Sequence, residues 1–266
     1  MRSARRSNPA KLGQHFLTGQ WAAHALAQAV SPNAGETILE IGPGKGALTR
    51  ELLRVSGRVI AVEKDHMLVD ILKNEFKNEI ENNRLTIVSV DIRDFDPENV
   101  GLRAGKYVLA ANIPYYITGE IIRQFLTTDA HPRAIGLLIQ KEVADRIIAR
   151  NGKESILSLS VKAYGTPKIV AKVSRGNFNP PPSVDSAILL IEGISKKTFV
   201  DVPEAAFFKV VKAGFSSKRK FLANNLANQF PKASVAHAFT ACNLKENVRA
   251  EDVPLEKWEM LTKKLS

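Results

Sequence analysis

The strongest constraint on the fold is the alternation, between residues 36 and 192, of short apolar runs with longer amphipathic runs. Near-continuous apolar runs are typical of strands buried on both faces, and amphipathic runs between them are typical of helices that cover such a sheet. The alternation therefore predicts an α/β fold with a mostly parallel sheet. The predicted strands are Thr37–Ile41, Arg58–Val62, Leu85–Ser89, Tyr107–Ala111, Ala134–Gln140, Lys168–Val173 and Ser186–Glu192.

Helices are predicted between these strands and before the first of them. The stretch 19–30 is expected to cover one face of the sheet, and the Gly-Asn-Pro-rich link between the last two strands predicts an antiparallel hairpin at one edge. The other predicted helices are Gly46–Val55, Asp65–Phe76, Thr118–Thr127, Lys141–Ala149 and Ile156–Ala163.

The chain changes character after Glu192, where no further strand pattern is found. Four amphipathic runs follow a short linker and predict a small helical domain. We therefore expect one domain over residues 1–195, which carries a basic N-terminal arm, and a second over residues 196–266. The predicted helices of the second domain are residues 203–215, 218–230, 233–242 and 254–265.

The charge of the chain points to a polyanionic partner. Lys and Arg number 38 against 27 Asp and Glu, a formal net charge of +11. The surplus gathers in an N-terminal group (Arg2, Arg5, Arg6, Lys11) and in "SSKRK", which contains Lys218, Arg219 and Lys220. Such clusters are typical of proteins that bind nucleic-acid phosphates. The alternatives are a merely basic enzyme and, for Lys218–Lys220, a solvated helix face.

The sequence also limits where the protein acts. Cys242 is the single cysteine, so an internal disulfide is excluded. No apolar run approaches the roughly 18 residues of a membrane helix, and the basic N-terminus has no apolar segment behind it. We expect a cytoplasmic protein with no membrane partner.

Glycines mark the end of the first strand in "LEIGPGKGALTREL". Gly42, Gly44 and Gly46 allow a tight turn and close approach of the backbone to a ligand. The spacing Gly42-x-Gly44-x-x-Ala47 also fits a dinucleotide fingerprint, so a nicotinamide-dependent oxidoreductase is an open alternative at this point.

Two acids end the next strands, Glu63 after the second and Asp91 after the third. Ligands of open α/β sheets bind at the carboxyl ends of the strands, where Glu63 suits ribose hydroxyls and Asp91 an adenine amine. Glu40 lies on the first strand itself, where a carboxyl group is costly unless it is paired. It is expected to shape the glycine turn or to face a cation such as a sulfonium. The alternatives are a strand-end acid for Glu63 and a turn or capping residue for Asp91.

The stretch "AANIPYYITG" follows the fourth strand and suits an acceptor base. The amide oxygen of Asn112 and the carbonyl of Pro114 can each accept a hydrogen from an exocyclic adenine amine, which orients its lone pair. Tyr115 can stack on the base and Phe178 can cover its other face, since a modified base must leave its own stack. For Tyr116 packing is the preferred interpretation, and for Phe178 the alternative is a place in the hairpin core.

Seven motifs then carry a resemblance: "KLGQHFL", "LEIGPGKGALT", "VEKD", "DIRDF", "NIPYYI", "FNPPPSVDSA" and "FSSKRKFLANNL". From Lys11 to the C-terminus the chain resembles the ribosomal RNA adenine dimethyltransferases. Its "KRKFLANNL" is similar to the housekeeping small-subunit members rather than to the erythromycin-resistance enzymes, which modify the large subunit.

The resemblance implies a class I methyltransferase fold, Rossmann-like with a seven-stranded mostly parallel sheet and a small all-helical C-terminal domain. It implies S-adenosylmethionine as methyl donor, no metal, and dimethylation at N6 of two adjacent adenosines near the 3′ end of small-subunit (16S) rRNA. The expected partner is that rRNA in an immature 30S particle, with the enzyme a monomer. The implied cofactor contacts are His15, Leu17, Gly42, Glu63, Asp91 and Asn112, to which the residue pattern adds Gly44.

Two positions depart from the family pattern. His15 stands where Asn is common, so it is either a cofactor contact or an ordinary residue at the start of a helix. Ser183 stands where Lys or Arg is frequent after the prolines, which removes one RNA-facing charge. A catalytically idle RNA-binding or assembly factor on the same fold is a further alternative.

Overall fold

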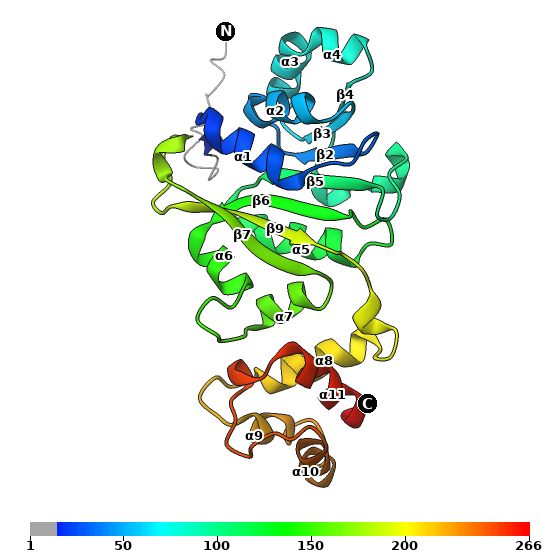
Figure 1. The fold of residues 1–266 in the computed structure, drawn as a ribbon, viewed down its shortest axis with the longest axis vertical. Coiled ribbons are helices and arrows are strands. Elements are labelled where there is room, and N and C mark those ends of the chain that lie inside the picture. The colour runs from blue at the N-terminus through cyan, green and yellow to red at the C-terminus, as the bar shows by residue number, and fades with distance from the viewer. Residues whose placement is uncertain (1–14) are drawn as a thin grey trace, which may run out of the picture. The chain divides into compact units, whose positions relative to one another are not determined.

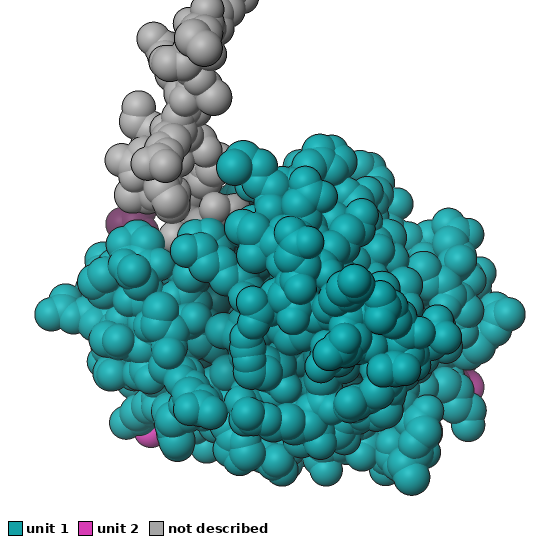
Figure 2. All heavy atoms as spheres, turned by 90° about the horizontal axis from the view of Figure 1, so that it is seen from above, with its two compact units in different colours: residues 1–144, 167–194 teal, residues 145–166, 195–266 magenta. Residues whose placement is uncertain are grey.

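The computed structural model describes residues 15–266, except for the side chain of Tyr115. The basic N-terminal group (Arg2, Arg5, Arg6, Lys11) lies outside these residues. The chain divides into two compact units, residues 1–144 with 167–194 and residues 145–166 with 195–266 (Figure 2). The second unit takes in residues 145–166 as well as the C-terminal segment.

The first unit contains the predicted sheet, in the strand order β4-β3-β2-β5-β6-β9-β7 (Figure 1). The strands from β4 to β6 pair in parallel, and β9 pairs antiparallel with β6. The seven strands are β2 (Thr37–Ile41), β3 (Val59–Glu63), β4 (Leu85–Ser89), β5 (Tyr107–Asn112), β6 (Ala134–Gln140), β7 (Thr166–Val173) and β9 (Ser186–Glu192). The prediction of a mostly parallel sheet is confirmed.

The order of the strands fixes where a ligand can bind. The chain builds outward from β2 to β4 on one side and from β5 to β6 on the other. Where the order reverses, between β2 and β5, the connections leave a crevice at the carboxyl ends of the strands.

A second, two-stranded sheet pairs the N-terminal segment with the proline-rich loop. Strand β1 (Phe16–Leu17) runs antiparallel to β8 (Phe178–Asn179), with Leu17 opposite Phe178. The sequence did not predict this pairing, because two residues are too few to show a strand pattern and their partners lie far along the chain.

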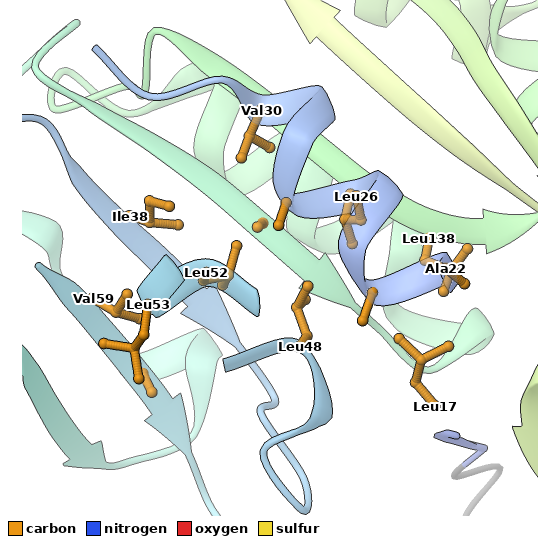
Figure 3. Close-up of a cluster of buried hydrophobic side chains, with 14 of the residues drawn as sticks. Leu17, Ala22, Leu26, Val30, Ile38, Leu48, Leu52, Leu53, Val59 and Leu138 are labelled. Carbon is orange, nitrogen blue, oxygen red and sulfur yellow. The ribbon is translucent and has the colours of Figure 1, made fainter. Parts of the chain in front are cut away.

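Two helices cover one face of the sheet with an apolar layer. Helix α1 (Gln20–Val30) contributes Ala22, Leu26 and Val30, and α2 (Ala47–Val55) contributes Leu48 and Leu52. In Figure 3 Leu52 of α2 lies toward Ile38 of β2, whereas Ala22 and Leu26 of α1 lie beside Leu138 of β6. The apolar residues of both helices recur with the period of one helix face, and this period is the feature from which the sequence predicted the helices.

Local signals start and stop the remaining helices of this unit. Helix α3 begins where the carboxylate of Asp65 accepts hydrogen bonds from the N–H groups of Met67 and Leu68, a normal N-cap. The run predicted as one helix to Phe76 continues as a short second helix. The elements are α3 (His66–Glu75), α4 (Lys77–Glu81) and α5 (Thr118–Thr127), and α6 (Lys141–Ile147) begins in this unit and ends in the second. The 3₁₀ turns are Ile92–Asp94, Pro97–Val100, Tyr115–Ile117 and Arg175–Asn177.

The second unit is helical, which confirms the predicted helical character of the C-terminal region, although it also includes residues 145–166, which were expected in the first domain. Its core holds the fully buried ring of Trp258, which stacks on Phe215 with ring centroids 5.5 Å apart and donates from Nε1 to the carbonyl of Val253. The helices are α7 (Ile156–Lys162), α8 (Glu204–Gly214), α9 (Leu222–Leu226), α10 (Lys232–Ala241) and α11 (Leu255–Leu265), with 3₁₀ turns at Lys197–Phe199 and Ala250–Asp252.

One predicted helix is wrong over part of its length. The run 218–230 is helical only over α9, and Lys218–Lys220 lie in a turn before it. The side chain of Asn225 holds this turn, because its Nδ2 donates to the carbonyls of Gly214 (2.6 Å) and Ser217 (2.9 Å). Those two bonds tie the backbone to a turn in place of a continued helix.

Candidate cofactor and acceptor site

The predicted cofactor residues meet at one cavity of the first unit, with a volume of about 670 Å³. It lies at the carboxyl ends of β2, β3, β4 and β5, where the strand order reverses. Sites for small ligands are typically of this size, roughly 300–1,000 Å³. The predicted residues on its wall are His15, Leu17, Gly42, Gly44, Glu63, Asp91, Asn112 and Pro114.

The glycine turn forms one wall of the cavity with its backbone. Gly42, Gly44 and Gly46 have φ angles of +65°, +60° and +81°, a region that favours glycine. A Cβ at Gly46 would overlap the ring of Phe76, so the packing at this position also requires glycine. Without side chains at Gly42 and Gly44, the cavity is bounded by peptide groups that a ligand can approach closely.

Glu63 ties this turn to the end of β3. Its carboxylate accepts hydrogen bonds from the N–H of Gly44 (3.3 Å) and the N–H of Asp65 (3.0 Å). The residue is 6% exposed, and burial raises the pKa of its carboxyl group against these bonds. The two bonds leave further lone pairs for ligand hydroxyls.

Asp91 is held by a cation that the sequence did not single out. Arg93 donates from Nε to Oδ1 (3.0 Å) and from Nη2 to Oδ2 (2.6 Å), and Lys64 lies 3.7 Å from Oδ2. The hydrogen bonds from Arg93 hold the pKa of Asp91 far below its usual range, so the residue is ionised throughout the neutral range. Asp91 also accepts from the N–H of Arg93 as a cap, so the capping alternative and the place on the cavity wall coexist. The sequence feature that could have indicated this ion pair is the spacing of Asp91 and Arg93, two residues apart in "DIRDF".

The acceptor motif is joined to the N-terminal segment. Nδ2 of Asn112 donates to the carbonyl of His15 (3.2 Å), and Nδ1 of His15 donates to the carbonyl of Pro180 (2.8 Å). This leaves Oδ1 of Asn112 on the opposite side of its amide group. Within the described part of the chain no donor is bonded to that oxygen. The bond from Nδ2 therefore leaves Oδ1 available as a hydrogen-bond acceptor.

Pro114 lies beside Asn112 on the cavity wall. Its carbonyl accepts the N–H of Ile117 at 3.2 Å, which uses one of two lone pairs. Tyr115 begins the 3₁₀ turn that follows, and its side chain lies outside the described residues. Tyr116, interpreted from the sequence as packing, is 68% exposed on the cavity wall.

Phe178 lies away from the cavity wall. It is 4% exposed and belongs to the apolar cluster under α1 and α2, where it faces Leu17 across the β1–β8 pair. The structure therefore favours the alternative of a core residue for Phe178. The sequence predicted that this ring covers one face of the acceptor base, but the β1–β8 pairing places it in the apolar cluster.

Lys218, Arg219 and Lys220 are exposed in the turn between α8 and α9. They are not helical, and their binding to RNA stays a prediction. Among residues 15–266, no group of three or more His, Cys, Asp or Glu side chains is arranged to hold a metal ion. None of the helices described is both long and apolar enough to cross a membrane.

Comparison with known proteins gives the family. Residues 5–266 match the family model for ribosomal RNA adenine dimethylase. A "Ribosomal RNA small subunit methyltransferase A" of Dehalococcoides mccartyi (strain CBDB1) is 41% identical over 253 residues, which cover 94% of this chain and 86% of the relative.

Solved structures agree. A dimethyladenosine transferase from Plasmodium falciparum superposes with a TM-score of 0.79 at 25% identity and covers 93% of this chain and 96% of its own. The 23S rRNA methyltransferase ErmE superposes with a TM-score of 0.76 at 24% identity, over 94% of this chain and 99% of its own, which shows the shared fold. The fold is that of a class I methyltransferase, and by its sequence over residues 5–266 this chain belongs to the ribosomal RNA adenine dimethylase family.

Proposed function

We propose that this protein transfers methyl groups from S-adenosylmethionine to N6 of two adjacent adenosines near the 3′ end of small-subunit rRNA. The supporting observation is that one cavity brings the glycine turn, Glu63 and Asp91 together with the Asn112-Ile113-Pro114 segment. It acts, in this proposal, as a cytoplasmic monomer on an immature 30S particle. Residues 1–195 are the catalytic domain and residues 196–266 the RNA-binding domain.

The residues present fit the donor. The cavity offers carboxylates for the ribose hydroxyls and the adenine amine, at Glu63 and Asp91, and glycine backbone for the rest. His15, Leu17, Gly42, Gly44 and Asn112 complete the proposed contacts. When bound, S-adenosylmethionine supplies a methyl group activated by its sulfonium charge.

The acceptor residues prepare the adenine amine, whose lone pair is otherwise delocalised into the ring. Oδ1 of Asn112 and the free lone pair of the Pro114 carbonyl each accept one amine hydrogen. These two hydrogen bonds orient the nitrogen and stabilise the positive charge that develops on it. No strong general base is required, because the amine becomes acidic only as it gains the methyl group.

Aromatic contact with the base is assigned to Tyr115. Phe178 is proposed from the sequence to cover the opposite face, and that role requires its ring to leave the apolar cluster in which it lies.

The test is methylation of immature small subunits that lack the modification, with mass spectrometry of the rRNA 3′ region. We expect N6,N6-dimethyladenosine at two adjacent positions. Methyl incorporation into large-subunit rRNA alone would reassign the substrate. Binding of donor and subunit without any methyl transfer would favour the idle assembly factor.

The basic turn should carry part of the RNA affinity. Replacing Lys218, Arg219 and Lys220 by Gln removes three exposed charges from a turn held in place by Asn225. Each phosphate contact contributes about 0.7–0.9 to the slope of log affinity against log salt, so we expect the slope to fall by about 2–3. Filter binding of small subunits across a salt series measures it.

A matched variant removes three exposed charges from the other unit, Lys73→Gln, Lys77→Gln and Arg103→Gln. It should leave the salt slope unchanged. Equal slopes for the wild type and the Lys218–Lys220 variant would remove this turn from the RNA-binding surface.

A further inference from the structure

Glu40 is the least expected residue of the sheet. It lies on β2 with an exposed fraction of 0%, opposite Ala61 of β3 and Ala110 of β5 in the strand register. Paired residues of neighbouring strands share a face, so these two small side chains leave room for a carboxyl group in the apolar layer under α1 and α2. The space is occupied by an acid in place of a hydrophobic side chain.

Neither oxygen of Glu40 makes a hydrogen bond of normal geometry with any described residue, and neither does the buried hydroxyl of Thr49. An ionised carboxylate without partners in such a place is very costly. Burial raises the pKa of Glu40 to about 8, and the hydroxyl and backbone N–H of Thr49 only partly oppose this. Glu40 is therefore mostly a neutral acid at neutral pH.

Glu40 nevertheless interacts electrostatically with the cavity wall. Gly42, two residues along the chain, is part of the cavity wall, and so is Glu63. Glu63 lies two residues beyond Ala61 and hence on the same face of the sheet as Glu40. The negative charge of Glu63 raises the pKa of Glu40 further, which means that charge at the cavity wall is felt at Glu40.

The surroundings of Glu40 offer few other charges. From β3 the charged group that acts on Glu40 is Glu63, whereas β5 presents Ala110, which carries no charge. On the covering helices, Thr49 of α2 is uncharged, and the buried Glu51 of α2 is already paired with His24 of α1 and with Arg54. A cation placed in the cavity would act on Glu40 with the opposite sign to Glu63.

We infer that Glu40 distinguishes the charged donor from its uncharged product, by losing its proton to solvent when a sulfonium occupies the cavity. This inference rests on the proposed function. S-adenosylmethionine carries a positive sulfur, and S-adenosylhomocysteine, which remains after methyl loss, does not. The carboxylate formed at Glu40 attracts the positive sulfur of S-adenosylmethionine, whereas the neutral sulfur of S-adenosylhomocysteine offers no such attraction.

The direction of the pH effect follows from linkage. A ligand that favours the deprotonated form binds more tightly as the pH rises toward the pKa of the free site. The affinity for the donor should therefore increase from pH 6.5 to 8.5 by several-fold more than the affinity for the product. Groups that both ligands share, including their own amino groups, cancel in the ratio of the two affinities.

The experiment is calorimetric titration of the full-length protein with S-adenosylmethionine and with S-adenosylhomocysteine, in buffers of different ionisation enthalpy. We expect the wild type to release more protons with the donor than with the product. In Glu40→Gln the difference should vanish, and the affinity ratio should no longer change with pH. Glu246→Gln, which removes an exposed carboxyl group, should behave as the wild type.

The outcomes separate this inference from the function on which it rests. If the wild type binds both ligands with equal proton release, the inference fails and the proposed function stands. If it binds neither, the proposed function fails and takes the inference with it. Because the proton count is measured on the wild type, a Glu40→Gln variant that does not fold leaves the test intact.

Discussion

Replacing Asn112 by Ala should lower the rate of methyl transfer about 100- to 1,000-fold, the loss typical of removing one preorganised polar group at a reacting centre. The amide of Asn112 is held by the carbonyl of His15, so its Oδ1 is already placed to accept an amine hydrogen. Alanine removes the acceptor and leaves the apolar neighbours of β5 in place. Single-turnover rates at saturating donor and RNA measure the effect on chemistry.

The matched control is Asn179→Ala, which truncates another amide on the same cavity wall. It should retain most of the rate, and both variants should bind immature subunits as the wild type does. An Asn112→Ala enzyme with a normal single-turnover rate would remove the amide from the proposed mechanism. A loss confined to donor affinity would leave it only as a cofactor contact.

Gly46→Ala should destabilise the protein by about 2–5 kcal/mol and weaken donor binding. The left-handed conformation of this residue, with φ +81°, costs an L-amino acid about 1–2 kcal/mol. The added Cβ also overlaps the ring of Phe76 and meets Leu72, and overpacking of a core typically costs about 1–3 kcal/mol. Denaturant unfolding gives the change in the free energy of unfolding, and calorimetry gives the donor affinity.

Gly101→Ala separates the two causes. Gly101 has nearly the same φ, +79°, but a Cβ there meets nothing within 4 Å. It should cost about 1–2 kcal/mol of conformational strain and leave donor binding unchanged. Equal losses of stability in the two variants would show that Phe76 moves aside without lowering the free energy of unfolding.

The sequence predicted the strands of the sheet more closely than any other feature. Thr37–Ile41, Leu85–Ser89, Ala134–Gln140 and Ser186–Glu192 have the predicted limits. Ala134–Gln140 and Ser186–Glu192 are buried over all but their last residue and are almost wholly apolar, so their ends are visible where polar residues resume. Leu85–Ser89 is only partly buried. The position of the cavity followed as well, since the carboxyl ends of these strands lie together in a parallel sheet.

Predictions were weaker where a side chain's environment depends on a distant segment. Phe178 was expected to cover one face of the acceptor base and is buried, because β8 pairs with β1 more than 150 residues earlier in the chain. Residues 218–221 were expected to be helical, but hydrogen bonds from Asn225 hold them in a turn. Propensity could not show either result, since both depend on contacts that form only in the folded chain.

The sequence by itself determined the alternation of strands and helices, the glycine turn, the acids that follow it and the membership of the family. These features are local, because each depends on residue types at short spacing along the chain. Only the tertiary structure decided the burial of Glu40 without hydrogen-bond partners, the pairing of β1 with β8 and the orientation of the Asn112 amide. Those properties depend on burial and on partners brought in from other segments, and a linear pattern carries neither.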